Sequence, residues 1–514
     1  MSDPMDMKES TRPPGCLIIV AIMAALVVAG IAAVLLYDAL MRGKVGAQLE
    51  QIRAAGQPVA FEEVLRMRDN VPDDQNAALV MGEALTVLDN APLAVPISDI
   101  YSLVAPDEPG VRCSDVALKL AQRQFAEHAK VLEIARRAAQ LETGVYPLKP
   151  EEVPFAIVLP HLLPLRDLTR LCACQTVATA QSGDGAAAAL SVKDGLRARA
   201  SLGEGWTIPE AVVGFTCDAI TYGSLECAMQ LGEMRAEDVR MLRGELARQE
   251  QTTDMTSAFI GERAMGIFAF SASREELNRL SGGKTVTGMG LYCTMPGLRE
   301  KDALFYLDVM GRYVEACSLP EREQMAESQR ILKSFDRAMF EGGPNHILSA
   351  MLMPAMRKAL GESLKARVRL RVARTALAVE EYRMANGHWP DTLYELVPQY
   401  LDAVPPDAFS DGPLRYVLDD EGALVYSLGT NAEDEGGLRM EDAPIVREIQ
   451  HSQAWDIPFR LLDPELRGAR QSTFRDDVMR SSLNLKALEP FGFDRGRLRE
   501  MGLTEDQIQT LISR

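Results

Sequence analysis

An uncharged apolar segment near the N-terminus constrains this chain more than any other feature. It runs from Leu17 to Tyr37 without a single charged residue. At about 1.5 Å of rise per residue, a helix of this length spans the roughly 30 Å hydrocarbon core of a bilayer. It exceeds the roughly 7–15 residues of a secretory h-region, and no small-residue cleavage motif closes it. The sequence therefore predicts an uncleaved transmembrane helix over 17–37, with a cleaved signal or a buried core helix as alternatives.

The charges that flank this segment do not decide its orientation. Lys8 and Arg12 precede it and Arg42 and Lys44 follow it, so the positive-inside count is a tie. A short tail over 1–16 is easily retained in the cytoplasm, whereas a long acidic domain crosses largely regardless of its charge. We therefore expect a single-pass protein of the cell inner membrane, with most of the chain in the periplasm.

The composition is that of a globular protein. The 514 residues are 47% hydrophobic and 25% charged, which is enough apolar surface for two or three packed domains. The net charge is -18, and an acidic surface repels phosphate backbones, so no nucleic-acid partner is expected. Seven cysteines follow the apolar segment without any C-x-x-C pair, which favours small buried side chains over a metal site and leaves one disulfide open.

The fold class predicted for the chain is mainly α. Residues 38–110 are expected to form a juxtamembrane helical stalk and loop, with Asp73 or Asp74 capping a helix that follows. Residues 111–345 show helical periodicity and no convincing strand. The segments LRDLTRLCACQTVATAQ and AAAALSVKDGLRARASL flank the turn SGDG, a pattern typical of a tetratricopeptide-type hairpin, so a helical array is predicted.

The pattern changes at about residue 346. A helix is predicted up to Ala385, with a bend at Pro354 and a C-cap at Asn386-Gly387. Thr392 and Glu395 have the spacing of a capping box for a short second helix. Two β-rich runs on either side of DDEG indicate an antiparallel hairpin. Residues 346–450 are thus predicted to form a small α+β module.

Beyond this module, residues 451–514 are predicted to be a helical tail. Thr504 and Gln507 have the spacing that caps its last helix.

Residues 371–437 resemble the globular part of the major pseudopilin, the G subunit, of type II secretion systems. The resemblance lies in ALAVEEYRMANGHWPDTLYELVPQYLDAVPPDAFSDGPLRY and LVYSLGTNAEDEGG. It implies a helix packed on a small antiparallel sheet, and in that family the fold hangs on an N-terminal membrane helix and polymerises in the periplasm. Here the apolar segment and the module are far apart, and Val20 stands where a pilin has its glutamate. Both departures argue against an ordinary filament subunit.

The resemblance also implies a calcium site, because pseudopilins bind Ca²⁺ in the loop after the last strand. Carboxylate, amide and carbonyl oxygens are the ligands that calcium prefers. Asn431 replaces the aspartate of the family, and a solvated acidic loop remains the alternative. Carried over by position, the candidate ligands are Leu428, Asn431, Asp434, Glu435, Glu441 and Asp442.

No catalytic constellation is predicted. The chain has no H-E-x-x-H or G-x-S-x-G motif, and its five histidines lack ligand spacing. A basic run over 365–374 has two interpretations: it docks on an acidic partner or on lipid head groups, or it pairs with the protein's own carboxylates.

These observations favour a membrane-anchored, non-enzymatic structural or interaction protein of the bacterial cell envelope. Its expected partners are the lipid bilayer, through residues 17–37, and envelope or secretion-system proteins. Two alternatives stay open. One is a hydrolase-like enzyme with an unrecognised site built from scattered acids in the helical body. The other is a divergent pseudopilin processed after Gly15.

Overall fold

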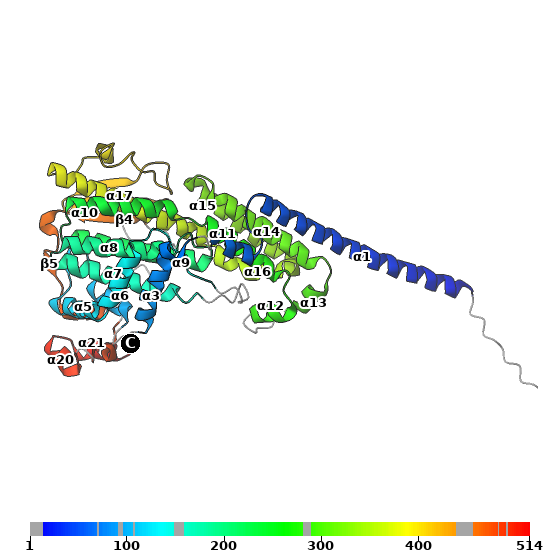
Figure 1. Ribbon diagram of the computed structural model, residues 1–514, viewed down its shortest axis with the longest axis horizontal. Helices are drawn as coiled ribbons and strands as arrows, with labels where there is room; N and C mark the ends of the chain where they lie inside the picture. The colour runs from blue at the N-terminus through cyan, green and yellow to red at the C-terminus, as the bar shows by residue number, and fades with distance from the viewer. Residues whose placement is uncertain are drawn as a thin grey trace, which may run out of the picture.

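The described part of the chain is mainly helical, as predicted, and contains two small sheets. A long first helix projects from an elongated body, and the last elements lie at the end of the body remote from the tip of that helix (Figure 1). The computed structural model describes residues 14–513 except 69–70, 91–95, 106–107, 149–158, 281–288, 438–455, 482 and 490–491.

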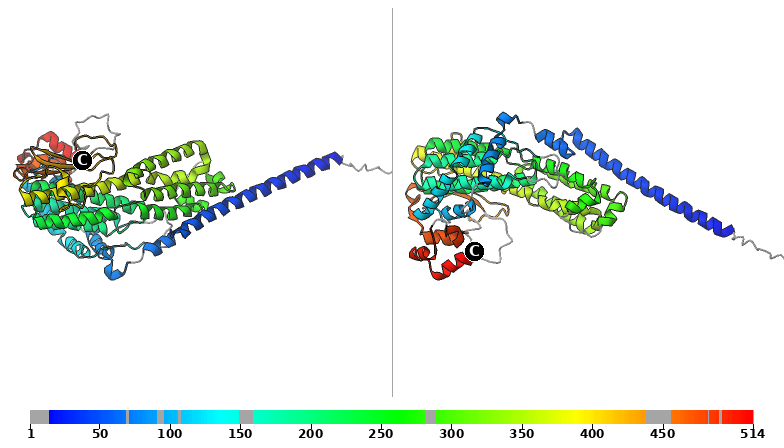
Figure 2. Two further views of the ribbon diagram at one scale, coloured as in Figure 1. Left: turned by 90° about the horizontal axis from the view of Figure 1, so that it is seen from above. Right: turned by 60° about the horizontal axis from the view of Figure 1, so that its bottom comes forward.

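Helix α1 (Pro14–Ala54) has two halves with different surroundings. Its first half carries apolar side chains that no described part of the protein covers; Leu26 is 68% exposed and Val28 is 65% exposed. By length and composition this helix is suited to cross a membrane. Its second half packs on the body, where Asp38 accepts a hydrogen bond from the amide of Gly297 at 2.9 Å. The helix leaves the body as a straight extension of the packed half (Figure 2).

Short elements follow α1 and cover one side of the body. The predicted cap at Asp73 or Asp74 is wrong, because these residues form a 3₁₀ turn. Asn76, at the end of that turn, is extended and caps α3 instead, accepting from the amide of Ala78 at 3.0 Å. The elements are α2 Phe61–Arg68, η1 Asp73–Gln75, α3 Ala77–Asp89, α4 Ile97–Val104, β1 Val111–Arg112, α5 Asp115–Glu127 and α6 Ala129–Ala138.

Four long helices make the centre of the body. The predicted helix, turn and helix around SGDG are present, and Asp184 caps the second helix by accepting from the amide of Ala187 at 2.9 Å. The third begins with a full capping box at Thr207 and Glu210. The helices are α7 Leu162–Gln181, α8 Gly185–Ala200, α9 Ile208–Leu231 and α10 Ala236–Thr252.

A second group of helices lies beside the packed half of α1. Two of them are antiparallel: Arg312 on α14 pairs with Glu327 on α15 at 3.0 Å, and Phe305 on α14 stacks on Phe335 on α15. The group consists of α11 Thr256–Ala269, α12 Arg274–Leu280, α13 Met289–Thr294, α14 Leu298–Cys317, α15 Glu321–Gly342, η3 Gly343–His346 and α16 Ile347–Leu352.

Helix α17 (Ala359–Asn386) is the longest helix inside the body. The 3₁₀ turn η4 (Met353–Met356) separates it from α16, so the helix predicted to bend at Pro354 is instead interrupted there. Its C-cap is Gly387 with φ of 80°, a left-handed conformation that glycine adopts without strain. The capping box of Thr392 and Glu395 starts the short turn η5 (Leu393–Leu396), also as predicted.

The three-stranded sheet packs against α17. Strands β2 (Arg415–Asp419) and β3 (Gly422–Ser427) form the predicted antiparallel hairpin. The third strand, β4 (Ile457–Leu462), pairs antiparallel with β3. It lies inside the tail that was predicted to be helical, so that prediction is wrong here. The apolar run IPFRLL contains Pro458, whose missing amide disfavours a helix as well as a central strand, and β4 is an edge strand.

The outer edge of β4 is closed by side chains of α9. The hydroxyl of Tyr222 donates to the carbonyl of Pro458, the carboxylate of Glu226 accepts from the amide of Arg460 at 2.7 Å, and Gln230 donates to the carbonyl of Arg460 at 3.3 Å. Tyr222, Glu226 and Gln230 are spaced four apart, so they share one face of the helix. An edge that is covered in this way does not pair with a further strand.

One hydrophobic core runs across the boundary predicted at residue 345. It joins Val192 of α8, Leu225 of α9 and Leu242 of α10 to Val372 of α17 and Phe459 of β4. The helical domain and the α+β module therefore share their interior.

The rest of the tail wraps back over the start of the body. Strand β5 (Arg470–Gln471) pairs in parallel with β1. Short helices then follow, and the cap predicted for the last one is present. The backbone amide of Thr504 donates to the side chain of Gln507, and the backbone amide of Gln507 donates to the hydroxyl of Thr504. These elements are η6 Pro464–Leu466, α18 Phe474–Arg480, α19 Leu485–Leu488, α20 Arg495–Glu500 and α21 Glu505–Ser513.

Candidate functional site

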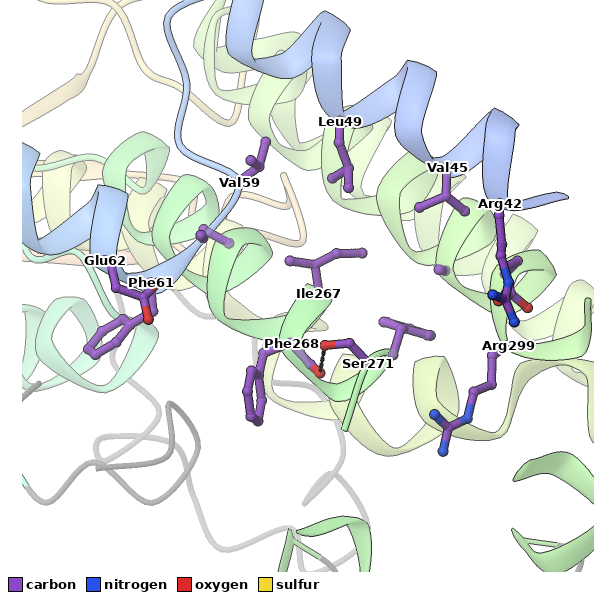
Figure 3. A pocket seen from close by; sticks show the side chains of 15 residues that line it. Arg42, Val45, Leu49, Val59, Phe61, Glu62, Ile267, Phe268, Ser271 and Arg299 are labelled. Carbon is purple, nitrogen blue, oxygen red and sulfur yellow. Dashed lines mark hydrogen bonds and ion pairs between the residues drawn. The ribbon is translucent and has the colours of Figure 1, made fainter. Parts of the chain in front are cut away.

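A cavity of about 390 Å³ lies between the packed half of α1 and the helices α11 and α14. Val45 and Leu49 point into it from α1, and Ile267 faces them from α11 (Figure 3). Phe61, at the start of α2, closes the end remote from the apolar half of α1. The volume falls within the roughly 300–1,000 Å³ typical of small-molecule sites. The cavity is thus large enough for a ligand and mostly apolar.

The charged residues of the cavity gather mainly at its other end. Arg42 and Arg299 lie there together, whereas Glu62 lies beside Phe61 (Figure 3). Arg42 pairs with Asp38 at 3.0 Å and with Glu300 at 3.4 Å. The two carboxylates that line the cavity, Glu62 and Glu300, therefore do not converge on one point. A hydrolytic site built from paired acids needs such convergence.

Two of the predicted calcium ligands meet in the loop after β3. The side-chain amide of Asn431 donates to a carboxylate oxygen of Glu435 at 2.5 Å. Ala432 between them has φ of 57°, which turns the loop back on itself. The predicted positions of Asn431 and Glu435 are therefore neighbours in space.

The third member of this cluster, Asp456, was missed by the sequence analysis. It is 5% exposed and accepts hydrogen bonds from the amides of Glu435 at 3.1 Å and Gly437 at 2.7 Å. Burial, and then the neighbouring Glu435 carboxylate, raise the pKa of Asp456 to about 7. No local sequence signal marks it, because it precedes a strand that was not predicted.

The other predicted ligands are engaged elsewhere or lie outside the described residues. Asp434 accepts from the hydroxyl of Tyr426 at 3.0 Å and lies 3.7 Å from Arg415. The side chain of Leu428 is buried, and its amide donates to Asp407 at 3.0 Å. Glu441 and Asp442 fall within 438–455, which the structure does not describe.

The cluster has one feature that suits a cation and one that does not. One oxygen each of Glu435 and Asp456 is buried without a hydrogen-bond partner among the described residues. Within the same residues, no group of three or more His, Cys, Asp or Glu side chains is arranged to hold a metal. Calcium needs about six to eight oxygens, so Glu435, Asp456 and the Asn431 amide oxygen would supply only part of its shell.

The basic run on α17 pairs with the protein's own acids. Arg371 contacts Glu250 and Glu321, each at 2.7 Å, while Arg367 contacts Glu321 at 3.0 Å and Arg374 contacts Glu250 at 3.1 Å. Of the two interpretations, internal pairing is the one observed. The run joins α17 to α10 and α15 and is not a free basic surface.

Two further acids, the buried Asp218 and the half-buried Glu262, lie away from the cavity lining. Burial raises the pKa of Asp218 to about 6, with Arg199 at 3.4 Å opposing the shift, and raises that of Glu262 to about 7. Neither residue lines the cavity. The described residues form no substrate site around either acid.

Comparisons with known proteins give no relative: no family model, no curated protein and no solved structure matches this chain. The structure itself defines a class of architecture. It is a mainly helical body with a small antiparallel sheet in its core, carried on one helix that is apolar and long enough to cross a membrane.

Proposed function

We propose that this chain is a single-pass inner-membrane protein of the bacterial cell envelope that acts as a non-enzymatic structural or interaction protein. The observation that carries the proposal is the uncovered apolar half of α1. Among its large side chains, Leu26, Val28 and Leu35 are each more than 60% exposed. Burying a side chain of this kind is favourable by about 1.5–3 kcal/mol, so a lipid environment stabilises this helix far better than water does.

The periplasm is the proposed side for the body. The resemblance of residues 371–437 to pseudopilins supports this side, because those proteins work there. A long acidic body also crosses a membrane regardless of its charge.

A role as an ordinary filament subunit is disfavoured by the packing. The proposed pseudopilin-like helix, α17, is enclosed by α9, α10 and the sheet, and α1 packs on α14 instead of continuing into α17. The outer edge of β4 is covered by side chains of α9 and does not offer a pairing surface. We therefore propose that the module serves as part of the core of a larger body.

The first prediction concerns attachment and partners. The full-length chain should resist carbonate extraction from membranes, and a variant lacking 17–37 should be soluble, because that segment holds the uncovered apolar surface. Mild cross-linking in intact cells should recover an envelope protein with the full-length chain. Deleting 346–450 is unsuitable as a control, since this removes α17 from the core.

Three outcomes would contradict this proposal. Full-length protein in the carbonate-soluble fraction would rule out the anchor. Recovery of the chain alone after cross-linking would argue against an interaction role. A mature N-terminus at Cys16, seen by mass spectrometry, would favour the processed pseudopilin.

We also propose that the loop after β3 binds calcium, on the strength of the two orphaned carboxylate oxygens of Glu435 and Asp456. A bound cation would offset the repulsion between these acids and favour their ionised forms. Its role would be to stabilise the loop, and no reaction step depends on it.

The second prediction tests this site through pH. Because the pKa of Asp456 is raised in the folded state, the folded chain binds more protons, and stability in chelator should fall as pH rises from about 4 to about 7. Calcium should raise the melting temperature at pH 8. Asp456→Asn should stabilise the chelated protein by about 1–3 kcal/mol and abolish the calcium response.

Asp420→Asn is the matched control, since this acid is exposed in the hairpin turn before β3. Identical melting curves with calcium and with chelator would disprove the calcium site.

A further inference from the structure

We infer that the cavity beside α1 binds the acyl chain of an acidic amphiphile, a fatty acid or a phospholipid, taken from the membrane that holds the anchor. The inference rests on the proposed attachment of α1 to a membrane. It is argued from the place of the cavity, the character of its walls and the hydrogen-bonding state of one arginine.

The cavity begins where the membrane would end. Arg42 follows Tyr37, the last residue of the apolar segment, by five positions, which is about 7.5 Å along a helix. The polar headgroup layer on each side of a bilayer is of similar thickness, about 5–8 Å. The arginine end of the cavity therefore lies at headgroup depth, and Leu49 lies about 18 Å from Tyr37 on the side away from the bilayer.

The walls favour a hydrocarbon chain. Val45 and Leu49 extend the apolar surface of α1 directly into the cavity, and Ile267 faces them from the opposite wall (Figure 3). Between its charged ends the cavity offers few hydrogen bonds, so that section holds water poorly. A soluble polar metabolite would also lose its hydration there, whereas an acyl chain would lose none. Acyl chains are present at very high local concentration beside this opening.

Arg299 indicates that the head group of the ligand is acidic. Its Nε is buried without a hydrogen-bond partner among the described residues, and one Nη donates only weakly, to the sulfur of Cys293 at 3.2 Å. Arg42 at the same end is already paired with Asp38 and Glu300. An unsatisfied guanidinium binds a carboxylate or a phosphate through strong charge-assisted bonds. A chain with an acidic head therefore matches the apolar walls of the cavity and its arginine end.

The test is photo-labelling of the full-length protein in liposomes. Two acidic probes are used, a palmitic acid with a diazirine in its chain and a phosphatidylglycerol with the same chain, and a fatty alcohol with the same chain is the uncharged control. The inference expects labelled peptides from 45–61 and 264–271 with at least one probe, and the probe that labels them identifies the source. Labelling confined to 17–37 with both probes would overturn the inference, because that segment contacts lipid in any case.

Two variants sharpen the result. Ile267→Trp fills the cavity and should reduce labelling of both peptides about tenfold, whereas Leu190→Trp, at a 52% exposed site on α8, should not. Arg299→Gln should reduce labelling by both acidic probes about tenfold. Labelling by the diazirine fatty alcohol, which has no charge, should not change. Arg330→Gln, at a 68% exposed arginine, is its control. Unchanged labelling in both cavity variants would overturn the inference even if one of them folds poorly.

The outcome is separable from that of the anchor proposal. Carbonate extraction of the same samples reports attachment. An attached protein without cavity labelling would disprove only the cavity inference. Labelled protein that is extractable would disprove the anchor and the membrane source of the ligand, while acyl-chain binding by the cavity would stand.

Discussion

Replacing Arg68 with methionine is expected to lower the free energy of unfolding by about 3–5 kcal/mol. The guanidinium of Arg68 binds Glu210 through two bonds of 2.7 and 3.0 Å, and both side chains are at most 2% exposed. Without Arg68, a buried carboxylate would lose its main counter-charge. The loss should be measured as a shift of the urea midpoint for the full-length chain in detergent.

This ion pair joins the anchor to the body. Arg68 ends α2, the first helix after α1, and also donates to the carbonyl of Tyr146 at 2.9 Å, while Glu210 lies in the first turn of α9. Its loss should therefore loosen the junction at which α1 is held. Limited proteolysis between 55 and 75 should become faster in the same variant.

Two controls separate charge from packing. Arg123→Met removes an exposed pair with Glu127 and should cost about 0.2–1 kcal/mol. The double change Arg68→Met with Glu210→Gln removes both buried charges while keeping an acceptor for the cap of α9, and should recover part of the loss. Equal losses for Arg68→Met and Arg123→Met would contradict the assignment.

The same pair predicts a dependence on acid. Burial alone would raise the pKa of Glu210, but His161 and the charge of Arg68 outweigh it and lower the pKa to about 2. Since the folded pKa lies below the unfolded value of 4.5, the stabilisation is complete above about pH 5 and is lost as pH falls toward 2. Arg68→Met should weaken this acid transition.

Most local signals in the sequence predicted local structure correctly, with the cap at Asp73 or Asp74 as an exception. The uncharged run of 17–37 lies in α1, and the turn SGDG separates α7 from α8. Gly387 ends α17, and the box of Thr392 and Glu395 begins η5, as expected. Each of these features is decided by side chains a few residues apart. Such short-range chemistry can be read without knowledge of the fold.

The features that could not be predicted depend on contacts that are distant in the chain. Arg68 and Glu210 are 142 positions apart, and β4 becomes a strand because α9 supplies partners for its outer edge. Asp456 joins Glu435 only because β4 lies beside β3. The cavity likewise forms between segments that start near residue 42 and near residue 264. Nothing in the local pattern of any of these segments identifies its partner.

Replacing Asp302 with alanine is expected to cost at least about 3 kcal/mol, a loss comparable to that of Arg68. Asp302 lies in the first turns of α14 and is fully buried. Its carboxylate accepts from the hydroxyl of Tyr292 at 2.7 Å, the amide of Leu348 at 2.9 Å and the hydroxyl of Ser349 at 2.5 Å. Alanine would leave these donors buried without an acceptor, so α13 and α16 should separate from α14.

The position of Asp302 links this loss to the cavity. Its neighbour Ala303 lines the cavity, and Arg299 lies one turn earlier on the same helix. Asp302→Ala should therefore lower the urea midpoint and also increase hydrogen exchange over 289–303, while the pairing of β2 and β3 stays protected.

Asp302→Asn keeps one acceptor oxygen and should cost less. Asp308→Ala, at an exposed position of the same helix, is the control. If Asp302→Ala and Asp308→Ala unfold at the same urea concentration, the buried carboxylate does not hold these three helices together.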